Sequence, residues 1–178
     1  MRMNSSSSPW VVVGGYLLVL GACTEGAQWR EMRPEGLNLA VSMPCQPHRS
    51  TRTVALAGER VDMTLLVCSY NDATFAVVSA RMTEPRNVGA ALQELVQTAR
   101  TNIGGRVVSA DRARVPGMTP NDGAVSQDIV GRSPEGNAIE MQIEVFAYGL
   151  KVLQVTYIGP RQEASTAKGL FDGLRVIP

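Results

Sequence analysis

The chain contains three cysteines, and the first stands in a setting suited to acylation. Cys23 follows Leu20, Gly21 and Ala22, which are one aliphatic and two small residues. Small residues let a backbone lie extended in the groove of a peptidase, and a cysteine thiolate is a good nucleophile for a diacylglyceryl group. The pattern therefore predicts cleavage before Cys23 and attachment of lipid to its sulfur.

The segment ahead of Cys23 is typical of an export signal. Residues 10–22 carry no charge, and Arg2 supplies one positive charge before them. Thirteen helical residues rise about 20 Å, short of the roughly 30 Å of a bilayer's hydrocarbon core. The end of the segment resembles the lipobox of bacterial lipoprotein precursors. The resemblance implies a lipid-anchored protein on the periplasmic face of the envelope, and Thr24 at the next position implies the outer membrane. The alternative is an ordinary signal peptide cleaved elsewhere.

The other two cysteines form an even pair. Cys45 and Cys68 are 23 residues apart, and each lies at the end of a segment with strand-like alternation. In an exported domain such a pair usually forms a disulfide. The alternative is two buried free thiols. A Cys–His metal site needs more ligands than His48, the only histidine, can add.

The remaining polar residues give no catalytic or metal-binding pattern. His48 lies in a Pro-containing segment without an evident partner, so we interpret it as a solvated loop residue. Asp111, Asp122 and Asp128 surround a loop but lack the tight spacing of a calcium site. Glu140 and Glu144 share a strand face about 13 Å apart, which favours a solvated face over acid–base work. We therefore expect no catalytic, cofactor-binding or metal site.

Arginines provide the only candidate binding patch. They are Arg100, Arg106, Arg112 and Arg114, which are close enough in sequence to receive an anion. The patch is local, because removal of residues 1–22 removes one basic residue, Arg2, and leaves 16 basic and 16 acidic residues. A formal net charge of zero argues against a general grip on nucleic acid, so we expect no nucleic-acid partner.

Hydrophobic periodicity predicts strands, then a helix, then strands, then a second helix. Alternating apolar residues mark strands near 37–43, 53–56, 61–67, 75–82, 106–110, 124–130, 139–145 and 150–158. A stripe from Val88 to Ile103 predicts one long helix, which Gly104 and Gly105 end. Residues 164–174 predict a short amphipathic helix. Grouped strands with few helices favour an α+β fold with an antiparallel sheet flanked by two or more helices.

This order of elements resembles the PsbP-like fold of DcrB-type bacterial lipoproteins. The points of likeness are Met43-Pro44 at the end of the first strand, a three-strand opening before one long helix, and Pro116-Gly117 before the last three strands. A terminal helix carries Leu170-Phe171-Asp172-Gly173-Leu174. The resemblance covers roughly residues 35–178 and implies an α/β/α sandwich. It also implies a noncatalytic accessory role, although fold alone is weak evidence about function.

The sequence thus predicts three parts, which are a lipoprotein signal peptide (1–22), a tether (23–36) and one α+β domain (37–178). We expect the domain to be a noncatalytic binding or accessory module of the cell envelope, held to the membrane by lipid and contacting an envelope protein. One alternative is a hydrolase or metal-dependent enzyme that uses the carboxylates within 111–128. Another is a purely structural envelope component.

Overall fold

The computed structural model describes residues 29–160 and 164–178. Cys23 and the predicted signal peptide (1–22) lie outside the described residues. None of the helices that are described is long and apolar enough to cross a membrane. The strands are β1 (Arg30–Met32), β2 (Leu39–Met43), β3 (His48–Leu56), β4 (Glu59–Tyr70), β5 (Ala73–Arg81), β6 (Arg106–Arg112), β7 (Val125–Arg132), β8 (Ala138–Tyr148), β9 (Lys151–Pro160) and β10 (Arg175–Val176), and the helices are α1 (Val88–Asn102) and α2 (Ala164–Phe171), with a 3-10 turn, η1 (Pro85–Asn87), before α1.

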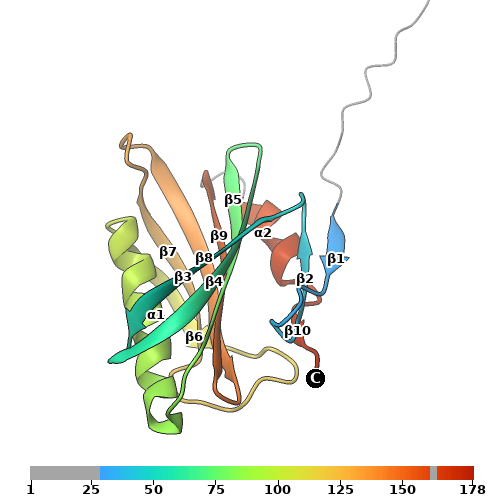
Figure 1. Cartoon of the computed structure of the whole chain (residues 1–178). Helices are drawn as coiled ribbons and strands as arrows, with labels where there is room; N and C mark the ends of the chain where they lie inside the picture. The colour runs from blue at the N-terminus through green and yellow to red at the C-terminus, as the bar shows by residue number, and fades with distance from the viewer. Residues whose placement is uncertain (1–28, 161–163) are drawn as a thin grey trace, which may run out of the picture.

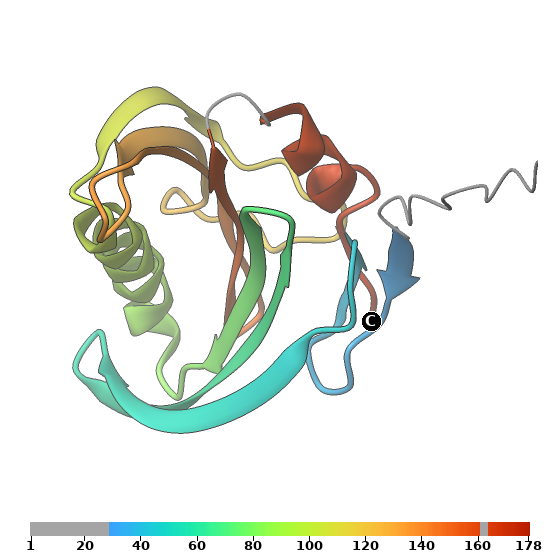
Figure 2. The same cartoon turned by 90° about the horizontal axis from the view of Figure 1, so that it is seen from above.

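A large antiparallel sheet forms the centre of the molecule, with α1 on one face and α2 with a small sheet on the other (Figure 1). Its strand order is β3-β4-β5-β9-β8-β7-β6, and every neighbouring pair is antiparallel. The β3–β4 turn places Ala57 and Gly58 at φ 48° and 79°, the positive values that a two-residue hairpin turn requires. Seen from above, this hairpin curls toward α1 (Figure 2). The α+β fold with an antiparallel sheet is confirmed.

Helix α1 forms where the apolar stripe predicts it. Its buried residues are Val88, Ala91, Leu92, Leu95 and Ala99. They recur at helical spacing and pack against β8 and β9. Gly104, at φ 54°, follows the helix and ends it. The predicted helix is therefore confirmed almost to its boundaries.

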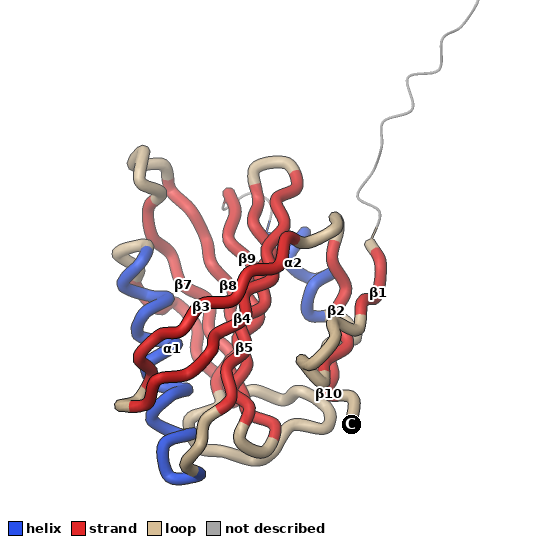
Figure 3. The backbone as a smooth tube through the Cα atoms, in the orientation of Figure 1, coloured by secondary structure: helices blue, strands red, loops and turns tan. Residues whose placement is uncertain are grey.

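The opposite face of the large sheet is covered by α2 and by a three-stranded sheet of order β1-β2-β10 (Figure 3). The sequence predicts one sheet, and the structure corrects this because β2 pairs with β10 at the other end of the chain.

The predicted tether is also too long. Residues 30–32 form β1, and Trp29 packs edge-on against Phe75 with ring centroids 5.5 Å apart.

The predicted Cys45–Cys68 disulfide is confirmed. Cys45 follows β2 of the small sheet, Cys68 lies on β4 of the large sheet, and their Cα atoms are 6.0 Å apart. The bond therefore joins the two sheets directly. Lys151 makes a second link, because its Nζ donates to the carbonyl of Gly36 and, over 2.7 Å, to Oδ1 of Asn38.

Candidate functional site

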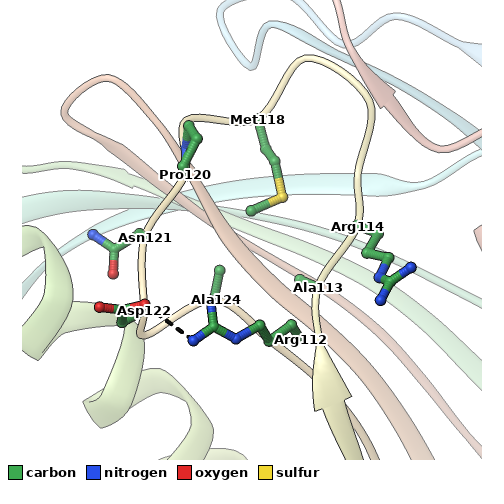
Figure 4. Close-up of a pocket in the computed structure, with 8 residues that line it drawn as sticks. All are labelled: Arg112, Ala113, Arg114, Met118, Pro120, Asn121, Asp122 and Ala124. Atoms are coloured by element: carbon green, nitrogen blue, oxygen red, sulfur yellow. Dashed lines mark ion pairs between the residues drawn. The ribbon is translucent and has the colours of Figure 1, made fainter.

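One cavity is an open cradle of about 780 Å³ formed by the loop between β6 and β7 (Figure 4). Arg112 reaches across it to Asp122 at 3.4 Å, while Arg114 extends away from both. The Arg112 and Asp122 side chains are 81% and 94% exposed, so this ion pair contributes little to stability. The cradle is open to solvent, and its single acidic side chain already offsets one of its cations.

The four arginines of the predicted anion patch fall into two pairs. Arg112 and Arg114 border the loop cradle. Arg106 begins β6, at its other end, and Arg100 is in the last turn of α1. A strand rises about 3.3 Å per residue, so Arg106 and Arg112 are roughly 20 Å apart along β6. The structure therefore does not bring the four side chains to one anion.

The predicted trio of carboxylates is only partly assembled. Asp111 and Asp128 lie on the neighbouring strands β6 and β7 as a diagonal pair on the same face, because Asp128 is opposite Ser109, two residues before Asp111. Neighbouring strand residues point to opposite faces, so Arg112 and its partner Asp122 belong to the other face. No group of three or more His, Cys, Asp or Glu residues that could hold a metal ion occurs among the described residues. This geometry does not favour the metal-dependent alternative.

Glu144 differs from the solvated residue that the sequence predicts. It lies on β8, diagonal to Asp128 and beside Phe171 of α2, and its Oε2 atom is buried without a hydrogen-bond partner. Burial raises the pKa of Glu144, and the charge of Asp128 raises it further, while a hydrogen bond from Ser126 opposes the shift. Burial likewise raises the pKa of Asp128, with a contribution from Asp111. The charge of Asp128 thus repels that of Glu144 on one side and that of Asp111 on the other, where Glu144 and Asp128 are partly buried.

A second cavity, of about 380 Å³, lies between α1 and the curled β3–β4 hairpin, and we call it the α1 groove. One wall is the C-terminal half of β3, and the other is the α1 segment 94–102. The sheet strands β4, β5 and β9 form the floor. The lining is mostly apolar, and its apolar members are Val54, Ala55, Leu56, Met63, Leu65, Val78, Leu95 and Ala99.

The floor of the α1 groove contains a buried polar residue. Gln154 is only 8% exposed, and its Nε2 donates to Oγ1 of Thr156, which is 4% exposed, over 2.8 Å. An apolar cavity of a few hundred Å³ with a small number of convergent polar groups is the usual form of a binding site. The α1 groove is therefore the better candidate site of the two cavities.

Two carboxylates hold the walls of the groove together. Glu94 of α1 accepts a hydrogen bond from the backbone N–H of Ala57, at the tip of the hairpin, over 2.7 Å. Glu59, which follows the turn, accepts from the amide and hydroxyl of Thr83 at 2.7 and 2.5 Å and from Asn87 at 2.8 Å. These bonds, led by the Thr83 hydroxyl, lower the pKa of Glu59 to about 2. The hairpin and the start of α1 are thus fixed relative to each other.

Sequence reasoning misses the α1 groove. The available signal is Gln154 and Thr156, two polar residues that alternate within the otherwise apolar run of β9. On a strand buried on both faces, such residues need a reason to be there. His48 is exposed, as the sequence predicts. It is, however, the first residue of β3 and does not belong to a loop.

No family model matches the chain, and neither does any curated protein. Among solved structures, the chain is similar to the solution structure of cyanobacterial PsbP (CyanoP) from Synechocystis sp. PCC 6803. The sequence identity is 16% and the TM-score 0.49, over 88% of this chain and 98% of that chain. An identity this low transfers neither activity nor partner from one protein to the other.

Proposed function

We propose that this chain is a lipid-anchored protein of the bacterial envelope whose PsbP-like domain binds a ligand or partner in the α1 groove without catalysis. The observation that carries the binding role is the groove itself, which is apolar and concave with an amide on its floor. The anchor rests on the Leu20-Gly21-Ala22-Cys23 pattern after an uncharged segment. The same pattern, with Thr24, supports a place on the periplasmic face of the outer membrane.

The noncatalytic character of the proposal rests on the chemistry of the groove. Its floor offers a neutral amide that is hydrogen bonded to a hydroxyl, and neither group is a nucleophile with an adjacent base. The two charged side chains at the walls are Arg52 and Glu94, and Glu94 is already bonded to the backbone of the hairpin. The Gln154 amide is therefore better suited to orienting an apolar partner than to transferring a proton.

The position of Trp29 supports the anchored arrangement. Cys23 lies six positions before Trp29, which packs on Phe75 of the large sheet. An extended chain spans about 3.5 Å per residue, so the lipid would be within roughly 20 Å of the folded domain. The domain would therefore act close to the membrane surface.

Photo-crosslinking in living cells tests the binding role. We expect a photoreactive residue in place of Thr98, an exposed residue of α1 that lines the groove, to form an adduct with a bound protein, lipid or small molecule. The matched control replaces Thr101, also exposed on α1 but absent from the groove lining. Equal labelling at the two sites, or none at either, would contradict the binding role and favour a purely structural envelope component.

Mass spectrometry of the membrane-extracted protein tests the anchor separately. We expect a mature chain that begins at Cys23 and carries the mass of acyl chains. Cys23→Ser should abolish both the modification and the partition into membranes, since two or more acyl chains are needed for stable anchoring. A mature form with unmodified Cys23 would overturn the anchor.

A further inference from the structure

Strand β3 is a long free edge of the large sheet. It spans His48–Leu56, and in the part of the chain that is described its only strand neighbour is β4. No proline interrupts it, and its residues are mostly exposed on both faces. An open edge of this length is a template for pairing with another strand.

The free main-chain groups of β3 belong to every second residue. In an antiparallel pair, hydrogen-bonded and non-hydrogen-bonded residues alternate. The tight β3–β4 turn makes Leu56 and Glu59 the hydrogen-bonded pair that flanks it, so the even-numbered residues of β3 bond to β4. Thr51, Thr53 and Ala55 therefore direct their N–H and C=O groups toward the open edge.

This edge borders the α1 groove. On the β3 side the groove is lined by Arg52, Val54 and Leu56. On the α1 side it is lined by Glu94, Thr98 and Asn102, which are spaced four residues apart. The α1 segment is about 12 Å long at 1.5 Å per residue, which matches about four residues of extended chain. The part of the unpaired edge from Arg52 to Leu56 and a mostly apolar groove of similar length thus lie side by side.

We propose that an extended segment of another protein adds to β3 as an eighth strand of the large sheet. Every second side chain of that segment is apolar and enters the α1 groove, and its backbone bonds to Thr51, Thr53 and Ala55. Strand addition of this kind takes affinity from main-chain bonds and selectivity from pockets for alternate side chains. The inference rests on the proposed binding role and names the class of partner.

The size of the groove favours a strand over a helix. A helix about 10 Å across and 12 Å long occupies roughly 900 Å³, more than twice the 380 Å³ of the groove. A strand needs only the usual spacing of about 4.8 Å from β3 and places two side chains in the groove. The amide of Gln154, on the floor of the groove, would hydrogen bond to a hydroxyl or amide at the inner end of such a side chain.

The charge on β3 favours a partner over a second copy of this chain. Arg49 and Arg52 give β3 two positive charges, and β3 has no acidic residue. Antiparallel pairing of β3 with itself about its central residue would set Arg52 opposite Arg52, and like charges directly opposite are destabilising. A partner segment with acidic residues beside its apolar positions avoids that cost.

Amide hydrogen exchange on the full mature protein in detergent micelles tests the proposal. The probe is the peptide acetyl-Asp-Thr-Val-Thr-Val-Asp-amide. At saturation we expect exchange at Thr51, Thr53 and Ala55 to slow at least tenfold, with little change at Arg52 and Val54, which β4 already protects. Uniform slowing along β3, or none, would overturn the strand addition.

Three variants sharpen the result. Thr98→Trp closes the mouth of the groove, and Thr53→Pro removes one outward donor at an edge position where proline is tolerated. Both should weaken peptide binding at least tenfold, whereas the control Thr101→Trp should leave it within twofold of the natural protein. Retention of affinity in Thr98→Trp would refute the role of the groove even if Thr53→Pro disturbs β3.

The outcome separates this inference from the proposed function. If the photoreactive residue at position 98 captures a lipid or small molecule and the peptide fails to bind, the groove is a binding site but not for a strand. If it captures a second copy of this chain through β3, the sheet pairs with itself and the hetero-partner is wrong.

Discussion

The disulfide should contribute a large share of the stability of the domain. Removing Cys45 and Cys68 together frees a loop of 23 residues in the unfolded chain. The chain-entropy relation gives a loss of about 11 cal/mol/K for a loop of this size, or about 3.4 kcal/mol at 25 °C. For a domain of about 150 residues that unfolds with about 2.1 cal/mol/K per residue, this lowers Tm by about 11 °C.

Differential scanning calorimetry of the natural protein and of the Cys45→Ala/Cys68→Ala variant measures this loss. Adding a reductant should lower the Tm of the natural protein toward that of the variant and leave the variant unchanged. Ellman titration of the unfolded, unreduced protein should find neither Cys45 nor Cys68 reactive. A shift below about 2 °C would show that the crosslink does not restrain the unfolded chain, and reactive thiols without reductant would refute the bond.

Four substitutions give further expectations, each measured by urea unfolding. Gly131→Ala should cost about 1–3 kcal/mol, because an added Cβ would lie 2.4 Å from the backbone oxygen of Ile103. Gly89→Ala, on α1 with its nearest atom at 3.7 Å, should stabilise by about 0.5–1 kcal/mol. Glu59→Gln should destabilise at neutral pH, because the lowered pKa of Glu59 stabilises the fold above about pH 4.5 and this support is lost as the pH falls toward 2. Glu144→Gln should stabilise at neutral pH, because the raised pKa of Glu144 makes the fold lose stability as the pH rises above about 4.5.

The pH dependence provides the control for the two carboxylates. The differences of Glu59→Gln and Glu144→Gln from the natural protein should have opposite signs at pH 7 and should both shrink on acidification. A pH-independent difference for either variant would mean that a lost contact, and not the carboxylate charge, causes it. For the glycines, equal effects at positions 89 and 131 would contradict the packing argument.

Local patterns in the sequence predict the elements that depend on near neighbours. The stripe from Val88 to Ile103 predicts α1, and the turns at Asn71 and Gly149 predict two hairpins, because helical spacing and turn chemistry act over a few residues. The Cys45–Cys68 pair follows from the even number of remaining cysteines and from the predicted export. These features require no knowledge of the three-dimensional arrangement.

Features that depend on distant residues escape sequence reasoning. The pairing of β2 with β10 joins residues more than 130 positions apart, and the alternation of apolar residues in a strand does not show which strand it pairs with. Glu144 is half-buried because Phe171 of α2 lies beside it. The α1 groove exists because the β3–β4 hairpin curls, and sheet curvature cannot be read from alternation alone. The candidate site was therefore hidden although most elements around it were predicted.

The pairing of β2 with β10 also determines when the small sheet can close. Val176 donates its N–H to Pro116 over 2.8 Å, and Ile177 donates to the carbonyl of Asn38 over 3.0 Å. In a chain that emerges amino end first, β2 appears more than 130 residues before its partner residues 175–176. Until those residues follow, one edge of β2 stays open and can pair with another strand.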